Sequence, residues 1–461
     1  MKTKKPTRTE RRSFLKTIGG ATAALATLPA LGSAQGTAPA RGAGAKYMGD
    51  FAAPRLDKVR IAMLGVGSRG SGHARQLAQI EGTEIVAVSD LYEDLARRTE
   101  GRVKERGHNP QVYFGDENLW RKMLAEAKPD AVIIATPWEL HAPMAVEAMR
   151  AGAHAFIEIP IGVTLDEMWS LVDTSEATGR HCMLMENVCY GREELLYLNM
   201  VRQGVIGEPL HGEAAYIHEL RGQMKQVERG TGSWRTLQYA KRNGNLYPCH
   251  GLGPVAEYMS LARTDDSFGR MVSFSSPARG RALFAKANFP PDHKWNQLEY
   301  TAGDINTSII KTVLGRTIMV QWDETSPRPY SRHNLIQGTK GTLAGFPNRL
   351  AIEGIDSYHE WKEGEEWEKV VAQYEHPLFK RVGDLAKKMG GHGGMDFLLL
   401  YRIVECLRNG LPLDQNVYEG CFWSAVTPLS AKSIAEDGAP QPFPDFTRGN
   451  WKTTKPLGIV A

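Results

Sequence analysis

Short apolar runs alternate with longer mixed stretches through the first half of the chain. Residues 59–64 (VRIAML) and 130–137 (DAVIIATP) are largely apolar runs of the kind that predict strands buried on both faces. Comparable runs fall within 84–90, 154–160 and 181–187. Each run is short and is followed by a polar or glycine-containing segment, so the pattern favours several short buried strands.

Two of the intervening stretches have helical character, one passing through His73, Leu77 and Ile80 and another covering His141–Gly152. Strands that alternate with helices predict a doubly wound parallel sheet with right-handed crossovers. Beyond residue 190 the pattern becomes strand-rich and irregular, which indicates a second domain. The expected segments are a leader, a linker with an N-terminal arm, a first domain and a second domain, at residues 1–34, 35–56, 57–187 and 188–461.

The formal net charge of +4 is distributed unevenly along the 461 residues. Seven basic residues and one acid fall in residues 1–34, so the rest of the chain carries 49 basic and 51 acidic residues and is close to neutral. This balance gives no electrostatic reason to expect a nucleic-acid partner. The five cysteines are odd in number and form no CxxC pair, so we expect neither a disulfide framework nor a metal site.

The leader has the layout of an export signal. Its basic stretch ends in Arg11-Arg12-Ser13-Phe14-Leu15-Lys16, a mildly apolar run covers 17–31, and small residues follow at 32–34. This resembles a twin-arginine signal, which exports folded proteins across the bacterial inner membrane. The alternative is a membrane anchor, but the run is short and rich in Gly, Ala and Thr. We therefore expect a periplasmic or otherwise extracytoplasmic protein with no membrane span in the mature chain.

A glycine-rich motif follows the first predicted strand. Gly65, Gly67 and Gly70 form GxGxxG, with Ser68 and Arg69 inside it, and a second predicted strand ends in Asp90, 20 residues after Gly70. In a Rossmann dinucleotide-binding unit these glycines permit the tight turn, the approach of the pyrophosphate and close packing of helix on strand. An acid at this distance bonds the ribose 2′-hydroxyl, which favours NAD. The alternative is a simple strand–helix turn.

Several candidate binding residues follow the ends of the predicted strands. Because ligands of parallel sheets bind beyond the carboxyl ends of the strands, these residues are expected on one rim. They are Asp90, Trp138, Glu139, Leu140, His141, Glu158 and Asn187. Arg69, inside the glycine-rich loop, could reach a phosphate or the ribose region of the same ligand.

The second half contains one segment with candidate chemistry. Tyr247 and His250 lie three residues apart in Arg242-Asn-Gly-Asn-Leu-Tyr-Pro-Cys-His-Gly-Leu-Gly-Pro254, between proline and glycine residues that favour a rigid loop or helix start. Tyrosine and histidine are natural acid–base groups. The alternative is a structural Tyr-Pro turn with a buried histidine. The segment 390–396 (GGHGGMD) either lines a site or only caps the apolar helix predicted at 397–407.

The order of the strand motifs resembles the Gfo/Idh/MocA oxidoreductases. The resemblance rests on the GxGxxG, on Ala135-Thr136-Pro137 and on Glu158-Ile159-Pro160. It implies a C-terminal α+β domain with a mostly antiparallel sheet over the nicotinamide. Typical dehydrogenases of this group have a lysine at the position of Ile159, and an isoleucine cannot move a proton.

The whole chain further resembles glycoside hydrolase family 109, the NAD-dependent α-N-acetylgalactosaminidases. The specific stretches are 47–57, 90–92, 186–190, 242–254 and 327–331. The resemblance implies NAD contacts at Ser68, Arg69, Asp90, Trp138 to His141, Glu158, Ile159, Asn187 and Tyr247. It implies sugar contacts at Tyr216, Arg235, Tyr247, Pro248, Cys249, His250 and Tyr330, although Cys249 stands where threonine is expected.

The resemblance also implies a substrate and a mechanism. The substrate is a glycan or small molecule with a terminal N-acetylgalactosamine, and a homo-oligomer is possible. Bound NAD⁺ oxidises sugar C3, the C1 substituent leaves by elimination, water adds, and C3 is reduced again. Tyr247 and His250 are the candidates for proton transfer, with their division of labour open. The alternatives are an exported sugar oxidoreductase of the glucose–fructose type and a nucleotide-loaded sugar-binding protein.

Overall fold

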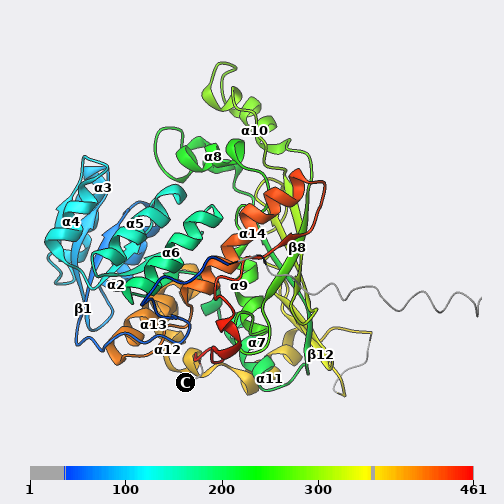
Figure 1. Cartoon of the computed structure of the whole chain (residues 1–461). Helices are drawn as coiled ribbons and strands as arrows, with labels where there is room; N and C mark the ends of the chain where they lie inside the picture. The colour runs from blue at the N-terminus through cyan, green and yellow to red at the C-terminus, as the bar shows by residue number, and fades with distance from the viewer. Residues whose placement is uncertain (1–35, 37, 355–358, 460–461) are drawn as a thin grey trace, which may run out of the picture. The chain divides into compact units, whose positions relative to one another are not determined.

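The first domain is a doubly wound parallel sheet (Figure 1). The computed structural model describes residues 36, 38–354 and 359–459, so the expected leader lies outside the described residues. Six parallel strands are arranged in the order β3-β2-β1-β4-β5-β6. They are β1 (Val59–Leu64), β2 (Thr83–Ser89), β3 (Gln111–Tyr113), β4 (Ala131–Ile134), β5 (His154–Ile157) and β6 (Cys182–Leu184). The order reverses between β1 and β4, where such sheets bind ligands.

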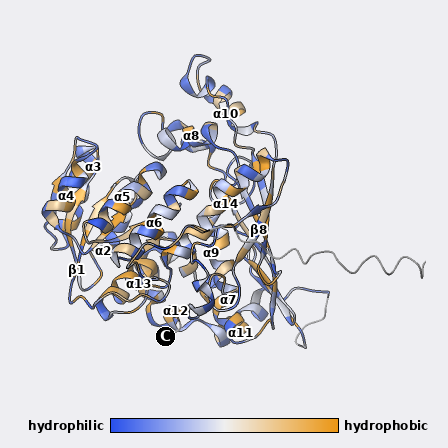
Figure 2. Ribbon diagram, viewed as in Figure 1, coloured by the Kyte–Doolittle hydropathy of each residue, from blue (hydrophilic) through white to orange (hydrophobic). Residues whose placement is uncertain are grey.

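Helices connect the parallel strands and cover the sheet. They are α2 (Ser68–Leu77), α3 (Glu93–Lys104), α4 (Leu119–Ala127), α5 (Trp138–Arg150) and α6 (Leu165–Thr178). The central strands β1, β4 and β5 are almost completely buried, as expected for strands covered on both faces. Figure 2 shows the same feature as hydrophobic colour along the strands. Helix α5 begins three residues earlier than expected, directly after Pro137.

The second domain contains an eight-stranded sheet in the order β13-β12-β11-β7-β10-β9-β8-β14. All neighbours are antiparallel except the parallel pair of β7 and β10, so the expectation of a mostly antiparallel sheet is confirmed. The strands are β7 (Pro209–Ile217), β8 (Phe268–Ser275), β9 (Ile305–Thr312), β10 (Thr317–Asp323), β11 (Leu335–Gly338), β12 (Gly341–Ala344), β13 (Arg349–Ile352) and β14 (Gln441–Pro442).

The remaining helices lie around this sheet and against the first domain. They are α7 (Arg192–Arg202), α8 (Thr231–Lys241), α9 (Cys249–Tyr258), α10 (Gly280–Asn288), α11 (Gly364–Tyr374), α12 (Pro377–Met389), α13 (Met395–Asn409) and α14 (Val417–Ala435). Short 3₁₀ turns complete the fold at η1 (Asn187–Tyr190), η2 (Arg221–Lys225), η3 (Lys294–Asn296), η4 (His392–Gly394) and η5 (Asn450–Thr453). No described helix is long and apolar enough to span a membrane.

Two segments tie the domains together. Helix α13 comes late in the sequence but packs against α2 and β1 of the first domain (Figure 1). The described part of the expected linker is a packed arm, in which Arg41 bonds Glu176 and the Tyr47 ring stacks on Tyr418 at 4.9 Å. The two domains are therefore held by shared structure, not only by a hinge.

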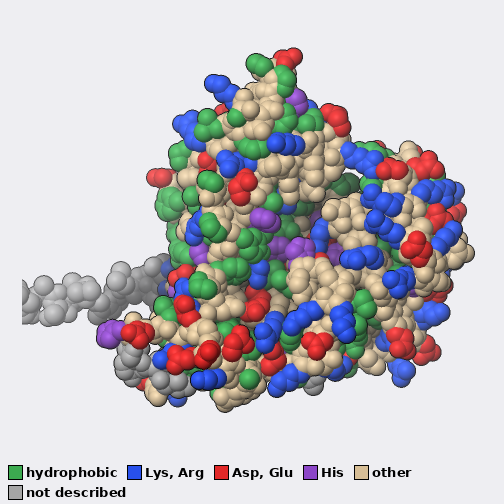
Figure 3. All heavy atoms as spheres, turned by 180° about the vertical axis from the view of Figure 1, so that it is seen from behind, with side chains coloured by type: hydrophobic (Ala, Val, Ile, Leu, Met, Phe, Trp, Pro, Cys, Tyr) green, Lys and Arg blue, Asp and Glu red, His purple; other side chains and the backbone are tan. Residues whose placement is uncertain are grey.

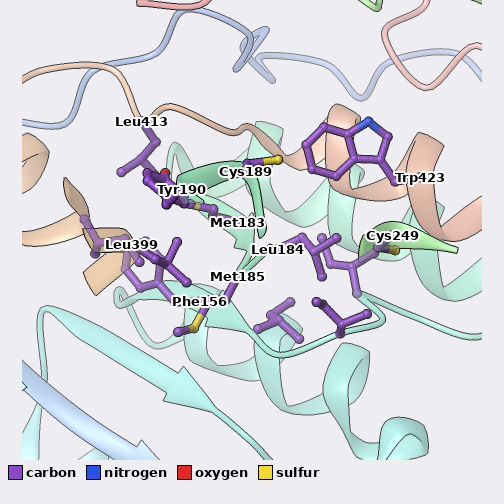
Figure 4. Close-up of a cluster of buried hydrophobic side chains, with 14 of the residues drawn as sticks. Phe156, Met183, Leu184, Met185, Cys189, Tyr190, Cys249, Leu399, Leu413 and Trp423 are labelled. Carbon is purple, nitrogen blue, oxygen red and sulfur yellow. The ribbon is translucent and has the colours of Figure 1, made fainter. Parts of the chain in front are cut away.

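A continuous apolar core joins the two domains behind the rim of the parallel sheet. Figure 4 shows Phe156 and Met183 of the first domain beside Leu399 of α13, with Trp423 of α14 and Cys249 of α9 in the same cluster. These side chains are at most 2% exposed. Because interiors are close-packed, this core fixes the rim relative to the start of α9.

Candidate active site

The glycine-rich loop forms the cradle that its sequence predicts. Gly65 has φ +77°, and a Cβ there would lie 2.8 Å from the carbonyl oxygen of Ala135. A Cβ on Gly70 would lie 1.9 Å from the carbonyl oxygen of Gly65, whereas a Cβ on Gly67 would meet no protein atom within 4 Å. Helix α2 begins at Ser68 with no side chain capping it. Its first amides and the open space at Gly67 fit a pyrophosphate.

Asp90 lies at the end of β2 and supports the loop. One carboxylate oxygen accepts the amide hydrogen of Val66 at 2.8 Å, and the other accepts that of Tyr92 at 2.9 Å. Beside it, Leu91 is 52% and Tyr92 41% exposed, along an open groove that Phe114 also lines. A carboxylate for the ribose followed by exposed apolar side chains suits the adenosine half of NAD.

Arg69 is engaged by two carboxylates. Its guanidinium donates to Glu158 at 2.8 Å and to Asp396 at 2.9 Å, and His73 bonds the same Glu158 oxygen at 2.6 Å. Burial alone would raise the pKa of Glu158, but the Arg69 charge and the His73 hydrogen bond hold it well below its usual range. The guanidinium of Arg69 is therefore not free to bind a phosphate. Its two ion pairs instead hold α2 against Glu158, which follows β5, and against Asp396 of α13.

Residues 138–141, which are expected to contact NAD, follow β4 and lie in three different environments. Trp138 is nearly buried and lies edge-on to Trp234, with ring centroids 5.4 Å apart, while Glu139 and Leu140 are exposed. His141 is only 1% exposed, and its ring nitrogens lie 2.7 Å from the carbonyl oxygens of Pro160 and Thr136. The expectation that His141 contacts NAD is therefore not supported, since its side chain is turned into the protein.

The neighbouring rim residues are held just behind the surface. Ile159 is 3% exposed, and Asn187, at the start of η1, donates to Asp396 at 2.7 Å. The side-chain oxygen of Asn187 has no hydrogen-bond partner among the described residues. Buried polar atoms normally have partners, so this acceptor is one observation that fits a bound polar group. Asp396 therefore bonds two of the expected cofactor residues, Arg69 and Asn187, which favours the interpretation that 390–396 lines the site.

Aromatic rings and histidines meet beside this rim. The rings of Tyr216, Tyr247 and His250 lie within about 5 Å of one another, with centroid separations of 4.8, 5.0 and 5.2 Å. The Tyr330 ring is 5.0 Å from His218, and the Tyr216 hydroxyl lies 2.9 Å from Nδ1 of His218. Figure 3 shows histidine side chains gathered around a hollow on one face of the molecule. This cluster brings most of the expected sugar contacts together.

Arg235 is the buried cation of the cluster. Its guanidinium lies 5.0 Å from the Trp138 ring centroid and 4.8 Å from that of Tyr247, and it pairs with Glu324. Tyr239 bonds both Arg235 and Glu324, which fixes the guanidinium. Arg235 thus touches residues of both domains. Nothing in the sequence indicated Glu324 and Tyr239, because Glu324 lies 89 residues from Arg235 and 85 residues from Tyr239 along the chain.

The start of α9 turns the side chains of the Tyr247–His250 segment in two different directions. Tyr247 and Pro248 precede the helix, and His250 lies in its first turn, so the rings of the tyrosine and histidine come together, with centroids 5.0 Å apart. Cys249 is 0% exposed, and its Sγ lies 3.6 Å from the Ser424 hydroxyl in the core. A sugar contact by Cys249 is therefore not supported, because successive helical residues cannot face the same side.

A basic segment of the second domain crosses to the cofactor edge of the first. Arg229 pairs with Asp94 at 2.6 Å, and its guanidinium lies 4.5 Å from the Tyr92 ring centroid. At the other end of the segment, Lys241 pairs with Glu139. The stretch 229–241 therefore contacts the first domain at both ends, beside the open groove at Tyr92 and at the first turn of α5.

Comparisons with known proteins agree with this geometry. Residues 59–186 match the family described as "Oxidoreductase family, NAD-binding Rossmann fold". Residues 190–453 match "Glycosyl hydrolase 109, C-terminal domain". Among solved structures, levoglucosan dehydrogenase in complex with NADH covers 84% of this chain and 100% of its own, with a TM-score of 0.63 and 16% identity. An NAD binding oxidoreductase from Klebsiella pneumoniae has a TM-score of 0.64, 17% identity, and coverage of 84% and 99%.

Full-length relatives are much more similar in sequence. "Glycosyl hydrolase family 109 protein 1" of Akkermansia muciniphila is 61% identical, over 98% of each chain. "Glycosyl hydrolase family 109 protein 2" of Shewanella sp. (strain ANA-3) is 55% identical, over 98% of this chain and 99% of its own. The two family matches divide the chain between a cofactor domain and a hydrolase domain. The protein is a member of glycosyl hydrolase family 109, an NAD-dependent glycosidase.

Proposed function

We propose that this protein hydrolyses terminal, α-linked N-acetylgalactosaminides by a transient oxidation at sugar C3. The observation that carries the proposal is how the carboxylates around the hollow are paired and how this shifts their pKa values. Glu158 and Asp396 are paired with Arg69, Glu324 is paired with Arg235, and Glu186 is fully buried behind His250, to which it is bonded. A glycosidase that uses two carboxyl groups needs one with a raised pKa as the acid. Here the pKa values of Glu158 and Asp396 are held below their usual range.

The groups that remain for proton transfer are Tyr247 and His250. Burial raises the pKa of Tyr247 well above its usual range, so this residue is a neutral phenol. A neutral phenol is suited to donate a hydrogen bond to an oxygen that gains negative charge. We assign the proton abstraction at sugar C2 to His250, and stabilisation of the C3 oxygen to Tyr247. This division goes beyond the sequence, which left the two roles open.

The bound sugar would lie among Tyr216, Tyr330 and Arg235. Aromatic rings present apolar faces to the C–H side of a sugar, and a guanidinium donates hydrogen bonds to its hydroxyl or acetamido oxygens. Arg235 is fixed by Glu324, so it loses little freedom when it binds. These three contacts orient C2 toward His250.

The cofactor chemistry accounts for the rest of the reaction. When bound, NAD supplies the redox step at C3 and ends in the form in which it began. The C3 ketone acidifies the C2 hydrogen, His250 takes that proton, and the C1–O bond breaks. The aglycone leaves as the alcohol after its oxygen receives the proton removed from C2. Water then gives a hydroxyl to C1 and a proton to C2, so the net change is hydrolysis. Ile159, in place of a lysine, offers no amine for ordinary alcohol oxidation.

The test is release of nitrophenol from an aryl α-N-acetylgalactosaminide by purified protein without added nucleotide. We expect steady release with no net change in absorbance at the NADH band. Release from the β-anomer alone would refute the α-linkage. No release, with NADH accumulating from free sugar and added NAD, would replace the proposal with the sugar oxidoreductase.

Variants test the two proton-transfer residues. Tyr247→Phe and His250→Ala should each lower kcat by about 10²- to 10⁴-fold, the usual contribution of general acid–base catalysis. Both should keep NAD, because neither side chain belongs to the glycine-rich cradle. Cys249→Ala is the matched control from the same helix start, since its side chain faces the core. Unchanged turnover in both Tyr247→Phe and His250→Ala would refute the site.

We also propose export by the twin-arginine route, supported by Arg11 and Arg12 within the basic leader. A glycosidase that recycles its cofactor could fold and bind NAD before export. Replacing both arginines by lysine should leave the protein in the cytoplasm, as measured by cell fractionation. Unchanged delivery of that variant to the periplasm would contradict this route.

A further inference from the structure

His250 is in contact with a buried carboxylate from the other domain. Its Nδ1 lies 2.7 Å from Oε1 of Glu186, and Glu186 is 0% exposed. Glu186 follows β6 in the first domain, whereas His250 lies in the first turn of α9 in the second. The pair therefore joins the two domains directly behind the proton-transfer residue.

Local structure holds Glu186 in place. The same Oε1 accepts the amide hydrogen of Val188 at 3.0 Å, which caps η1, and Gln415 donates to the Glu186 carbonyl at 3.2 Å. The other carboxylate oxygen has no partner among the described residues. A Cβ on Gly253 would lie 3.0 Å from Glu186 Cγ, so glycine at this position lets α9 approach the carboxylate.

The geometry determines which nitrogen of His250 is available. A carboxylate only accepts hydrogen bonds, so Nδ1 carries the proton that it donates to Glu186. Nε2 is then left as the acceptor, as in other histidines oriented by a carboxylate. Three further titratable groups face His250. The ring centroids of Tyr216 and Tyr247 lie 5.2 and 5.0 Å from that of His250, and His218 interacts with His250 electrostatically.

We propose that Glu186 is the positioning residue of His250, which holds the imidazole with Nε2 toward the sugar. This rests on the proposed function, in which His250 moves a proton. An adjacent negative charge favours the imidazolium. Removing the charge lets the imidazolium lose its proton at lower pH, whether His250 acts as an acid or as a base. A residue with a purely structural role has no such effect on the pH profile.

The test is Glu186→Gln, measured as kcat and KM against pH on the NAD-containing protein. We expect kcat to fall about 10- to 100-fold, part of the usual general acid–base contribution, with KM changed less than threefold. The limb of the kcat profile that belongs to His250 should move to lower pH, because the negative charge beside the imidazole is gone. Glu419→Gln is the matched control, because Glu419 is equally buried and pairs with Arg263 away from the hollow. It should destabilise the fold without moving the profile.

A double variant separates this inference from the proposed function. In a His250→Ala background, Glu186→Gln should cost no further activity, because its effect acts through the histidine. An equal loss in both backgrounds, or an unmoved pH limb, would overturn the role of Glu186. If His250→Ala itself keeps full turnover, the proposed function fails instead.

A second variant covers the case in which Glu186→Gln does not fold. Glu186→Asp keeps the charge but withdraws it by one methylene group. It should lower kcat while leaving the pH limb where it is, because the charge near His250 remains. Unchanged kcat in Glu186→Asp would contradict a positioning role that depends on the 2.7 Å contact.

Discussion

The space at Gly67 provides a sharp test of the cofactor site. In Gly67→Ala the added methyl group meets no protein atom within 4 Å, so the fold should tolerate it. The same methyl group would occupy the space that the pyrophosphate needs. We therefore expect a variant that folds normally and fails to keep NAD.

The size of the effect follows from the hydrogen bonds at the start of α2. A hydrogen bond from an amide to a charged group contributes about 1.5–3 kcal/mol. If the methyl group displaces the phosphate from one such amide, NAD affinity should fall about 10- to 150-fold, since 1.4 kcal/mol is a factor of ten. Two or more displaced bonds would leave the purified protein without cofactor.

Two glycines inside the helix that follows, α2, serve as controls. Gly72→Ala also meets no atom within 4 Å but lies one turn beyond the cradle, so it should keep NAD. It should stabilise α2 by about 1 kcal/mol, the usual difference between glycine and alanine in a helix. Gly70→Ala should lower both stability and NAD content, because its Cβ would lie 1.9 Å from the Gly65 carbonyl oxygen.

The assay measures NAD released by denaturation per chain, thermal unfolding, and turnover with and without added NAD. Gly67→Ala should regain turnover at high NAD concentration. Full NAD content and normal turnover in Gly67→Ala without added nucleotide would refute the cradle. Loss of folding in Gly67→Ala, with Gly72→Ala intact, would show that the space is needed by the protein itself.

Three further predictions test other parts of the site. Arg229→Ala removes the ion pair with Asp94 and should speed NAD release only a few-fold, measured by competition with a fluorescent analogue, because an ion pair exposed to solvent contributes little. Burial alone would raise the pKa of Asp396, but the hydrogen bond with His392 and the charge of Arg69 hold it below its usual range. This carboxylate therefore adds stability above about pH 4 that is lost as the pH falls, so Asp396→Asn should unfold more easily at pH 7 and show a weaker dependence on acid in thermal melts. Cys249→Ala should leave the substrate KM within twofold, and a large rise would restore a sugar contact for this residue.

The parallel domain could be predicted from the sequence because its strands are buried on both faces. Residues 59–64 were predicted as a strand and form β1 with the same bounds. Strand β3 had no such signal, since only one of its three residues is buried. The start of α5 was missed because a proline at 137 fixes the backbone just before a helix as readily as it ends a strand.

The site residues that could be predicted are those whose position depends on local spacing. The spacing of Tyr247 and His250 predicted that both side chains face one way, and they do, because a helix begins between them. The same spacing turns Cys249 away, which a resemblance to relatives could not reveal. Partners such as Asp396, 327 residues from Arg69, leave no local pattern at all.

By itself the sequence determined the parallel sheet, the glycine cradle and the pairing of Tyr247 with His250, because each depends on residues a few positions apart. The tertiary structure alone decided which charges are neutralised and which groups stay available for chemistry. Arg69 is taken up by Glu158 and Asp396, and His250 is oriented by Glu186. These contacts join segments that meet only when the two domains share one core, and burial makes such pairings obligatory, since an unpaired charge costs several kcal/mol in the interior.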